Sequence, residues 1–203
     1  MEYRHERTFA MIKPDAFYQG RIADIVEQFE EAGMTISMAY TTEPDEEKVR
    51  EHYSEVQEEG RYDLLERVVD YLAGEPVMPM VLEGRNSVEK VRNLTGGTSP
   101  LEAGNDTIRG KYSSYSFKDA EKEGIALPNL VHAADSREAA EEEIQLWLED
   151  EHTIDYIRPD EEWLRIQSFG ETLDADIREQ LQDQYGLSEE ELEAVYDTII
   201  NQF

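Results

Sequence analysis

The chain has 203 residues, no cysteine and a formal net charge of −29, from 48 acidic against 19 basic side chains. The lack of cysteine excludes disulfides and thiolate chemistry, and the negative charge argues against nucleic acid as a main partner, because its phosphates would be repelled. No apolar stretch approaches membrane-spanning length and the start, MEYRHERTF, does not resemble a signal peptide, so we expect a cytoplasmic protein without membrane attachment.

Hydrophobic periodicity in the first part of the chain predicts alternating strands and helices. The expected strands are residues 8–13 and 34–42, and the expected helices are residues 21–32, 45–59 and 63–73. Pro14 ends the first strand, and Gly33 and Gly60 end the first two helices, as glycine commonly does after a helix. This part of the chain therefore has the pattern of a mixed α/β domain.

The second part adds two strands and two helices. Residues 77–82 predict a strand, and residues 86–94 predict a helix that begins with a capping box of Asn86 and Glu89. The apolar run at 125–131 predicts a final strand just before His132, followed by the last core helix. With the helices at 45–73 counted as an insertion, the order is βαββαβ, the ferredoxin-like α/β (α+β) fold with a four-stranded antiparallel sheet.

The segment NLVHAADS, residues 129–136, places His132 where an apolar run meets a helix start. We expect Asp135 to cap the following helix, with Glu138 three residues further on, because acidic side chains at a helix start complement its dipole. A lone histidine at a strand end is more often a hydrogen-bonded core residue than a catalyst. Its neighbours therefore have to decide between the two interpretations.

Glu143 favours the catalytic interpretation. It lies between Ala140 and Trp147 at the edge of the apolar face of the last helix, whereas the two glutamates before it point to solvent. A half-buried carboxylate needs a partner. An imidazole supplies one, and a carboxylate on one ring nitrogen fixes the tautomer and leaves the other nitrogen free to attack. We therefore interpret His132 as a nucleophile.

Six ordered segments of the chain resemble the nucleoside diphosphate kinase family. They are ERTFAMIKPDA (6–16), EHYSEV (51–56), PVMPMVLEG (76–84), VRNLTGGTSP (91–100), GNDTIRGKY (104–112) and NLVHAADS with a glutamate eleven residues after the histidine. An ordered set is far more specific than any single motif. The resemblance covers residues 3–167, so we expect a kinase domain at 1–167, and it implies the ferredoxin-like fold.

The resemblance also implies a role for each matching residue. His132 would carry the γ-phosphoryl group from a nucleoside triphosphate to a nucleoside diphosphate in a ping-pong reaction, with Glu143 orienting it. Lys13 and Tyr53 complete the implied catalytic set. The implied nucleotide-binding residues are Lys13, Tyr62, Arg92, Thr98, Arg109 and Asn129.

These implied roles have plainer alternatives. A solvated charge at a strand end would explain Lys13, and core packing would explain the ring of Tyr53. However, Lys13, Arg92 and Arg109 would converge on one place in a very acidic chain, and binding of an anion explains such convergence. Tyr62 is the candidate for stacking on the base, since the phenylalanine that stacks in the family has no clear match here.

Nucleotide and metal would be held without a dedicated loop or cage. The chain has neither G-x-x-x-x-G-K-[ST] nor a glycine-rich dinucleotide turn, so side chains would hold the phosphates. We expect Mg²⁺ to enter bound to the nucleotide phosphates. The expected partners are nucleoside tri- and diphosphates, such as ATP, GTP and ADP, and further copies of the chain in a hexamer or tetramer.

Several features depart from the family pattern. Ala134 replaces a common serine, and Ala16 and Gln19 stand where glycine and arginine are usual. Residues 113–128 carry an insertion, which we expect to be a surface excursion near the site. Residues 168–203 form a predicted extension of two amphipathic helices, which would cover their own or a neighbouring subunit.

Two other functions remain open at this point. One is a non-catalytic nucleotide-binding or regulatory module on the same scaffold, which would be expected to lack His132 or Lys13. The other is an interaction protein that acts through its C-terminal helices. Separately, the acidic residues are spread along every predicted helix and only six lysines occur. This pattern favours a halophilic protein, because concentrated salt would screen the self-repulsion.

Overall fold

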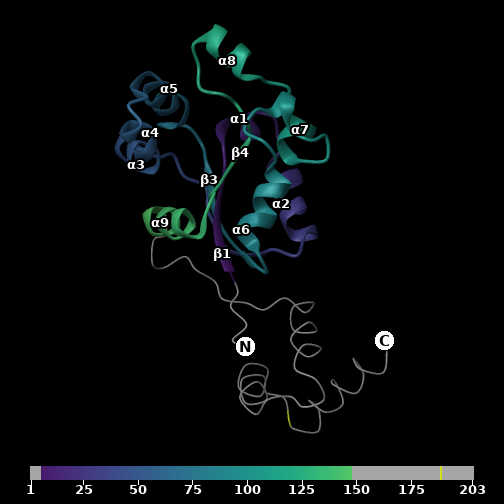
Figure 1. Cartoon of the computed structure of the whole chain (residues 1–203). Helices are drawn as coiled ribbons and strands as arrows, with labels where there is room; N and C mark the ends of the chain where they lie inside the picture. The colour runs from purple at the N-terminus through teal and green to yellow at the C-terminus, as the bar shows by residue number, and fades with distance from the viewer. Residues whose placement is uncertain (1–5, 148–187, 189–203) are drawn as a thin grey trace. The chain divides into compact units, whose positions relative to one another are not determined.

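The fold centres on a four-stranded antiparallel sheet with strand order β2-β3-β1-β4 (Figure 1). The computed structural model describes residues 6–147 and residue 188. The strands are β1 (Glu6–Ile12), β2 (Thr35–Ala39), β3 (Met78–Gly84) and β4 (Val131–Ala133). The helices are α1 (Pro14–Tyr18), α2 (Ile22–Glu31), α3 (Glu46–His52), α4 (Ser54–Glu58), α5 (Tyr62–Leu72), α6 (Ser87–Thr95), the 3-10 turn η1 (Pro100–Glu102), α7 (Ile108–Tyr112), α8 (Phe117–Glu123) and α9 (Arg137–Trp147). The predicted ferredoxin-like arrangement is confirmed.

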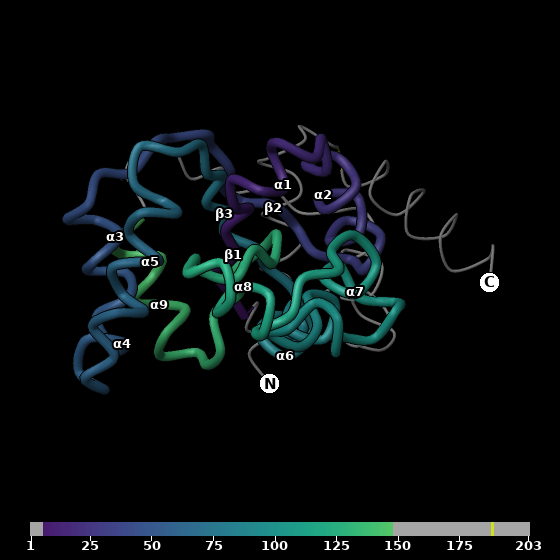
Figure 2. Tube along the Cα trace, turned by 90° about the horizontal axis from the view of Figure 1, so that it is seen from above, coloured from purple at the N-terminus to yellow at the C-terminus, as the bar shows by residue number. Residues whose placement is uncertain are grey.

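Helices cover both faces of the sheet (Figure 2). Because successive side chains of a strand point to opposite faces, Phe9 and Met11 pack with the helices α3, α5 and α9. Ala10 and Ile12 belong to a second core with α2, α6 and α7. Burying a side chain as large as Phe9 stabilises the fold by about 1.5–3 kcal/mol. The strand β1 is therefore the centre of both hydrophobic cores.

The register of β4 determines which way His132 points. His132 pairs with Met11, and its neighbours Val131 and Ala133 are buried in the core on the α2 side. His132 therefore faces the α9 side of the sheet. The predicted strand that ends before His132 is wrong in its bounds, because Leu130 adopts a left-handed φ of 70° that interrupts the extended chain just before Val131.

The two predicted helix caps are also wrong. Asn86 makes no capping bond and itself has a left-handed φ of 51°. The carboxylate of Glu6 accepts a hydrogen bond from the backbone N–H of Val88 instead, so a residue from β1 satisfies the start of α6. The helix α9 begins at Arg137, later than expected, and the hydroxyl of Ser136 rather than Asp135 accepts from its first turn.

The predicted helix at 45–59 is split at Tyr53, which has non-helical backbone angles. In a continuous helix, adjacent residues point about 100° apart. The break allows both His52 and Tyr53 to face the same cavity. The insertion at 113–128 contains α8, which Ser116 and Asp119 cap reciprocally and which is mostly exposed, as a surface excursion would be.

The predicted helices and domain at 168–203, and the boundary at residue 167, lie outside the described residues and stay predictions. Within the described part of the chain, no helix has both the length and the apolar character needed to cross a membrane.

Candidate active site

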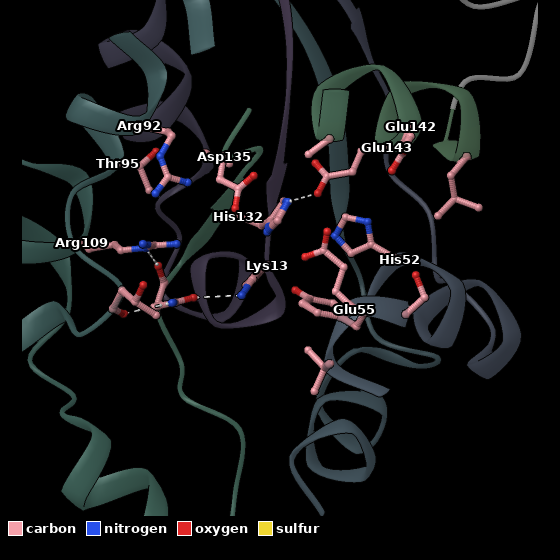
Figure 3. A pocket seen from close by; sticks show the side chains of 18 of the residues that line it. Lys13, His52, Glu55, Arg92, Thr95, Arg109, His132, Asp135, Glu142 and Glu143 are labelled. Carbon is pink, nitrogen blue, oxygen red and sulfur yellow. Dashed lines mark hydrogen bonds and ion pairs between the residues drawn. The ribbon is translucent and has the colours of Figure 1, made fainter. Parts of the chain in front are cut away.

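A cavity of about 610 Å³ lies beside the ends of β1 and β4, between α6 and α7 on one side and α3, α4 and α9 on the other. In Figure 3, Arg92 and Arg109 lie on one wall and His52 and Glu143 on the other, with His132 and Lys13 between them. The sheet positions His132 and Lys13, and the helices on the two faces supply the walls. The cavity therefore combines a cationic wall with a histidine and carboxylate wall.

His132 and Glu143 form the pair that the sequence predicts. The Nε2 atom of His132 lies 2.8 Å from Oε1 of Glu143. The side chains are only 20% and 15% exposed, respectively. Within the described residues no hydrogen bond occupies Nδ1 of His132, which leaves that nitrogen as the one free to react.

Burial keeps the imidazole neutral. The pKa of His132 falls to about 3, first because burial disfavours the charged ring and then because Lys13 and Arg109 are close. Burial also raises the pKa of Glu143, to about 7, while the neighbouring His52 opposes that rise. At pH values above the pKa of Glu143, the pair is a neutral imidazole that donates its Nε2–H to a carboxylate. This is the protonation state of a nucleophile at Nδ1.

Lys13 and Asn129 are linked in the cavity floor. The Nζ atom of Lys13 donates to Oδ1 of Asn129 at 2.9 Å, and Nδ2 of Asn129 donates to the carbonyl of Thr98 at 3.1 Å. The pKa of Lys13 falls to about 8, mainly through burial and next through Arg109. A phosphate bound here would supply the counter-charge that this buried ammonium needs.

Arg109 and Arg92 differ in their surroundings. Arg109 is 9% exposed and donates to three backbone carbonyls, those of Gly96, Asn129 and Val131. A guanidinium has five N–H donors, so Arg109 ties the turn at Gly96 and residues 129–131 to α7 and keeps two donors for an anion. Arg92 lines the same cavity from the last turn of α6. Both arginines are therefore where the sequence predicts them, but one of them also organises the backbone.

The remaining predicted residues divide into two groups. Tyr53 and Thr98 line the cavity, and the hydroxyl of Tyr53 is buried without a partner among the described residues. Burial also raises the pKa of Tyr53 well above its ordinary value, so the hydroxyl stays protonated. Tyr62 is 61% exposed at the start of α5 and is not among the residues that line the cavity. The structure therefore does not bring Tyr62 together with the others.

His52 lies in this site although sequence reasoning gave it no role. The ring of His52 lies 4.7 Å from the ring of His132, and Nδ1 of His52 accepts a hydrogen bond from the indole of Trp147 at 3.2 Å. The signal was present, because His52 stands in the matched segment EHYSEV. A place on the apolar face of a helix is typical of core packing, and only the fold brings His52 against His132 and Glu143.

His52, His132 and Glu143 each offer one nitrogen or oxygen within 4.8 Å of the others, which is the only such cluster found among the described residues. A metal would need a lone pair on each nitrogen. The indole N–H of Trp147 already uses the lone pair on Nδ1 of His52, so the proton of the neutral ring resides on Nε2. As arranged, the cluster suits hydrogen bonding better than metal binding.

Comparisons with known proteins point to one family. Residues 6–153 match the family model for nucleoside diphosphate kinase. A nucleoside diphosphate kinase of Archaeoglobus fulgidus is 35% identical over 160 residues, which are 78% of this chain and 97% of that protein.

Two solved structures are similar over most of this chain. The nucleoside-diphosphate kinase from Borrelia burgdorferi, a transition state mimic with bound vanadate and ADP, has a TM-score of 0.74 at 32% identity and covers 77% of this chain and 95% of its own. A halophilic nucleoside diphosphate kinase from Halobacterium salinarum, in complex with CDP, has a TM-score of 0.69 at 32% identity. The match covers 79% of this chain and 99% of that protein.

Proposed function

The chain belongs to the nucleoside diphosphate kinase family, and we propose that it exchanges γ-phosphoryl groups between nucleoside tri- and diphosphates through a phosphohistidine at His132. The activity follows from the family, and the assignment of residues is the proposal. The observation that supports it best is the 2.8 Å contact between Nε2 of His132 and Glu143, which leaves Nδ1 free within a cavity that three cations line.

The first half-reaction forms one bond and breaks one. The lone pair on Nδ1 of His132 attacks the γ-phosphorus, the bond from that phosphorus to the β–γ bridging oxygen breaks, and the nucleoside diphosphate leaves with the bond electrons. The phosphorylated ring becomes positively charged, and the carboxylate of Glu143 stabilises that charge through Nε2–H. In the second half-reaction a terminal oxygen of the acceptor diphosphate attacks the same phosphorus and releases Nδ1.

The cationic wall binds the phosphates. Arg92, Lys13 and the two spare donors of Arg109 neutralise the non-bridging oxygens as charge moves during transfer. The hydroxyl of Tyr53, buried without a partner among the described residues, donates near the reacting phosphate, and Thr98 adds a further contact. Asn129, already bonded to Lys13, contacts the ribose. Tyr62 as a base-stacking residue would require a movement of the exposed start of α5 towards the cavity.

The residues of the cavity suit Mg²⁺ carried by the nucleotide. Glu55, Asp135 and Glu142 line the cavity with carboxylate oxygens, the ligands that Mg²⁺ prefers, and they would hold it directly or through water. When bound, the ion supplies positive charge at the phosphate oxygens. The cationic side chains would then position the phosphates, and the carboxylates would hold the metal.

We also propose that the chain forms a homo-oligomer, a hexamer or a tetramer, in the cytoplasm. Light scattering after size-exclusion chromatography of the full chain and of a chain truncated at residue 167 would measure the assembly of each. A smaller assembly for the truncated chain is expected if the extension covers a neighbouring subunit. An unchanged assembly would contradict that role for the extension.

The phosphohistidine provides the decisive test of function. After incubation with γ-labelled ATP, the protein should carry an acid-labile, base-stable phosphoryl group that it passes to added GDP. His132→Ala should carry none, while His52 and the other histidines remain. Formation of the same adduct by His132→Ala would refute the assignment, and its absence from the unaltered protein would favour a non-catalytic nucleotide-binding module.

A further inference from the structure

His52 lies between a buried indole and the catalytic pair. Its ring is 4.7 Å from that of His132, and 5.7 Å from that of Trp147, which is 1% exposed. In Figure 3 the side chain of His52 lies next to Glu143 on the wall opposite the arginines. No step of the proposed reaction uses this histidine.

The indole sets the tautomer of His52. An indole nitrogen can only donate a hydrogen bond, so the 3.2 Å contact from Nε1 of Trp147 makes Nδ1 of His52 the acceptor. Burial lowers the pKa of His52 to about 3, and the nearby His132 lowers it next, so the ring is neutral. Its single proton is therefore on Nε2.

Two buried atoms of this group lack partners among the described residues. They are Nε2 of His52, which carries a proton, and Oε2 of Glu143, which has lone pairs to accept one. A nitrogen of each histidine and an oxygen of Glu143 lie within 4.8 Å of one another. A buried donor and a buried acceptor thus belong to neighbouring side chains beside the nucleophile, without a hydrogen bond between them in this structure.

We propose that His52 is a positioning residue for phosphoryl transfer, and that its Nε2–H donates to Oε2 of Glu143 whenever that carboxylate is ionised. The bond keeps the Glu143 carboxylate ionised and holds the Nε2–H of His132 towards Oε1, so that Nδ1 carries the phosphoryl group. Trp147 acts one step further away, by fixing which nitrogen of His52 bears the proton. This inference rests on the proposed function of His132.

The charges around Glu143 make such a donor necessary. Asp135, before α9, and Glu142, on α9, both raise the pKa of Glu143, in addition to burial. From β4, His132 supplies one hydrogen bond, and the protonated hydroxyl of Tyr53 faces the group from the break between α3 and α4. The cations that act on His132 are Lys13, Arg92 and Arg109, across the cavity. Because His52 is neutral, it can favour the ionised carboxylate only by donating its Nε2–H, and that N–H has no other partner among the described residues.

Replacing His52 should change the pH dependence of the first half-reaction. His52→Phe keeps a ring but removes the donor, so the pKa of Glu143 should rise and the acid limb of phosphoenzyme formation should move up by about one pH unit. The rate should therefore fall about fivefold at pH 7 and about tenfold well below pH 7. His52→Gln retains an N–H donor and should restore most of the loss. Rapid quench with γ-labelled ATP from pH 5 to 9 measures the rate of phosphoenzyme formation and the midpoint of its acid limb. Thermal unfolding shows whether each variant folds.

A purely structural role would give a different result. His52→Phe would then lower the rate by one factor at every pH, without moving the midpoint, and His52→Gln would be equally impaired. Either result overturns the proposal. Trp147→Phe keeps an aromatic ring at this position and removes the indole N–H, so it should shift the acid limb in the same direction as His52→Phe. An unmoved limb counts against the proposal.

Nuclear magnetic resonance tests the same inference without turnover. The chain has four histidines, so long-range ¹H–¹⁵N spectra can assign each ring. His52 should be neutral with its proton on Nε2, and the ¹³C carboxyl titration of Glu143 should move to higher pH in His52→Phe. A proton on Nδ1 of His52 would refute the proposed hydrogen bond from Nε2 to Glu143. If the proton is on Nε2 and the Glu143 titration shifts, but no phosphohistidine forms, the proposed function fails and the pairing of His52 with Glu143 stands.

Discussion

At the scale of single residues, the contact of Glu143 with Nε2 of His132 would determine which ring nitrogen reacts in the proposed transfer. Above the pKa of Glu143, about 7, the carboxylate accepts from Nε2–H and leaves the lone pair on Nδ1. Below it, the protonated carboxyl donates to Nε2, and the ring proton moves to Nδ1. The pKa of His132 is about 3, so protonation of the ring itself contributes only at far lower pH. Phosphoenzyme formation should therefore decline as pH falls through about 7.

Glu143→Gln tests this dependence. A neutral amide cannot stabilise the charge of the phosphorylated ring, so the rate should drop roughly 100-fold or more, as when the orienting carboxylate of a catalytic histidine is lost. The acid limb near pH 7 should disappear, because the group that titrates there is gone. Rapid quench at several pH values measures both. An acid limb that persists in Glu143→Gln would assign that titration to another residue.

The two arginines of the cavity should respond differently to the same substitution. Arg109→Lys loses at least two of three backbone contacts, so it should destabilise the protein by about 1–3 kcal/mol and also raise KM for ATP. Arg92→Lys, at an exposed position of the cavity, should raise KM with little change in stability. Thermal unfolding and steady-state kinetics separate the two effects. Equal stability of both variants would contradict an organising role for Arg109.

At the scale of elements, Asp15 joins three parts of the fold at the site. It follows β1 at the start of α1, where Oδ1 accepts from the hydroxyl of Tyr71 on α5 at 2.6 Å. Its Oδ2 accepts from the backbone N–H of Leu130 at 2.9 Å. These bonds hold the left-handed conformation of Leu130, which costs about 1–3 kcal/mol for a residue other than glycine. The resulting turn directs Asn129 to Lys13 and starts β4.

Asp15→Ala should therefore affect both stability and binding. Loss of two partly buried hydrogen bonds is expected to destabilise the protein by about 2–3 kcal/mol, and release of Leu130 should move Asn129 and raise KM. Tyr71→Phe is the matched control, because it removes only the Oδ1 bond and should cost about 1 kcal/mol with KM unchanged. Denaturant unfolding and nucleotide titration measure the two quantities. A normal KM in Asp15→Ala would show that the turn holds without the carboxylate.

At the scale of the whole molecule, the net charge of −29 contrasts with the cationic wall of the active site. Lys13 and Arg109 are buried, and Arg92 lines the cavity beside them. Many other charged side chains of the described part lie at the surface, where acids outnumber bases and repel each other. This excess of acidic side chains is the basis for expecting a protein adapted to concentrated salt.

Salt should therefore stabilise the full chain. The screening length falls from about 10 Å in 0.1 M salt to about 3 Å in 1 M salt, so the repulsion between surface carboxylates weakens. We expect Tm to rise steadily with KCl up to molar concentrations and folded structure to be lost in dilute buffer. Circular dichroism across a KCl series measures this. Full stability without added salt would contradict a halophilic adaptation.

The sequence predicts local structure well where one periodic pattern dominates. The alternation of residues 8–13 and the apolar faces of α2, α5 and α9 identify elements that the structure contains. Prediction from the sequence fails where contacts with distant residues outweigh the local pattern. The carboxylate of Glu6 replaces the expected cap at Asn86, and Leu130, held by Asp15, moves the start of β4. The short helices α1 and α7 have too few residues for a periodic pattern.

By itself, the sequence determined the family, the fold class and the pairing of His132 with Glu143, because ordered motifs and helical spacing are properties of the chain alone. Only the tertiary structure decided that Arg109 ties separate backbone segments together, that His52 stands between Trp147 and Glu143, and that Tyr62 lies outside the cavity. Those relations join residues far apart in sequence. They depend on strand register and helix packing, which no local pattern encodes.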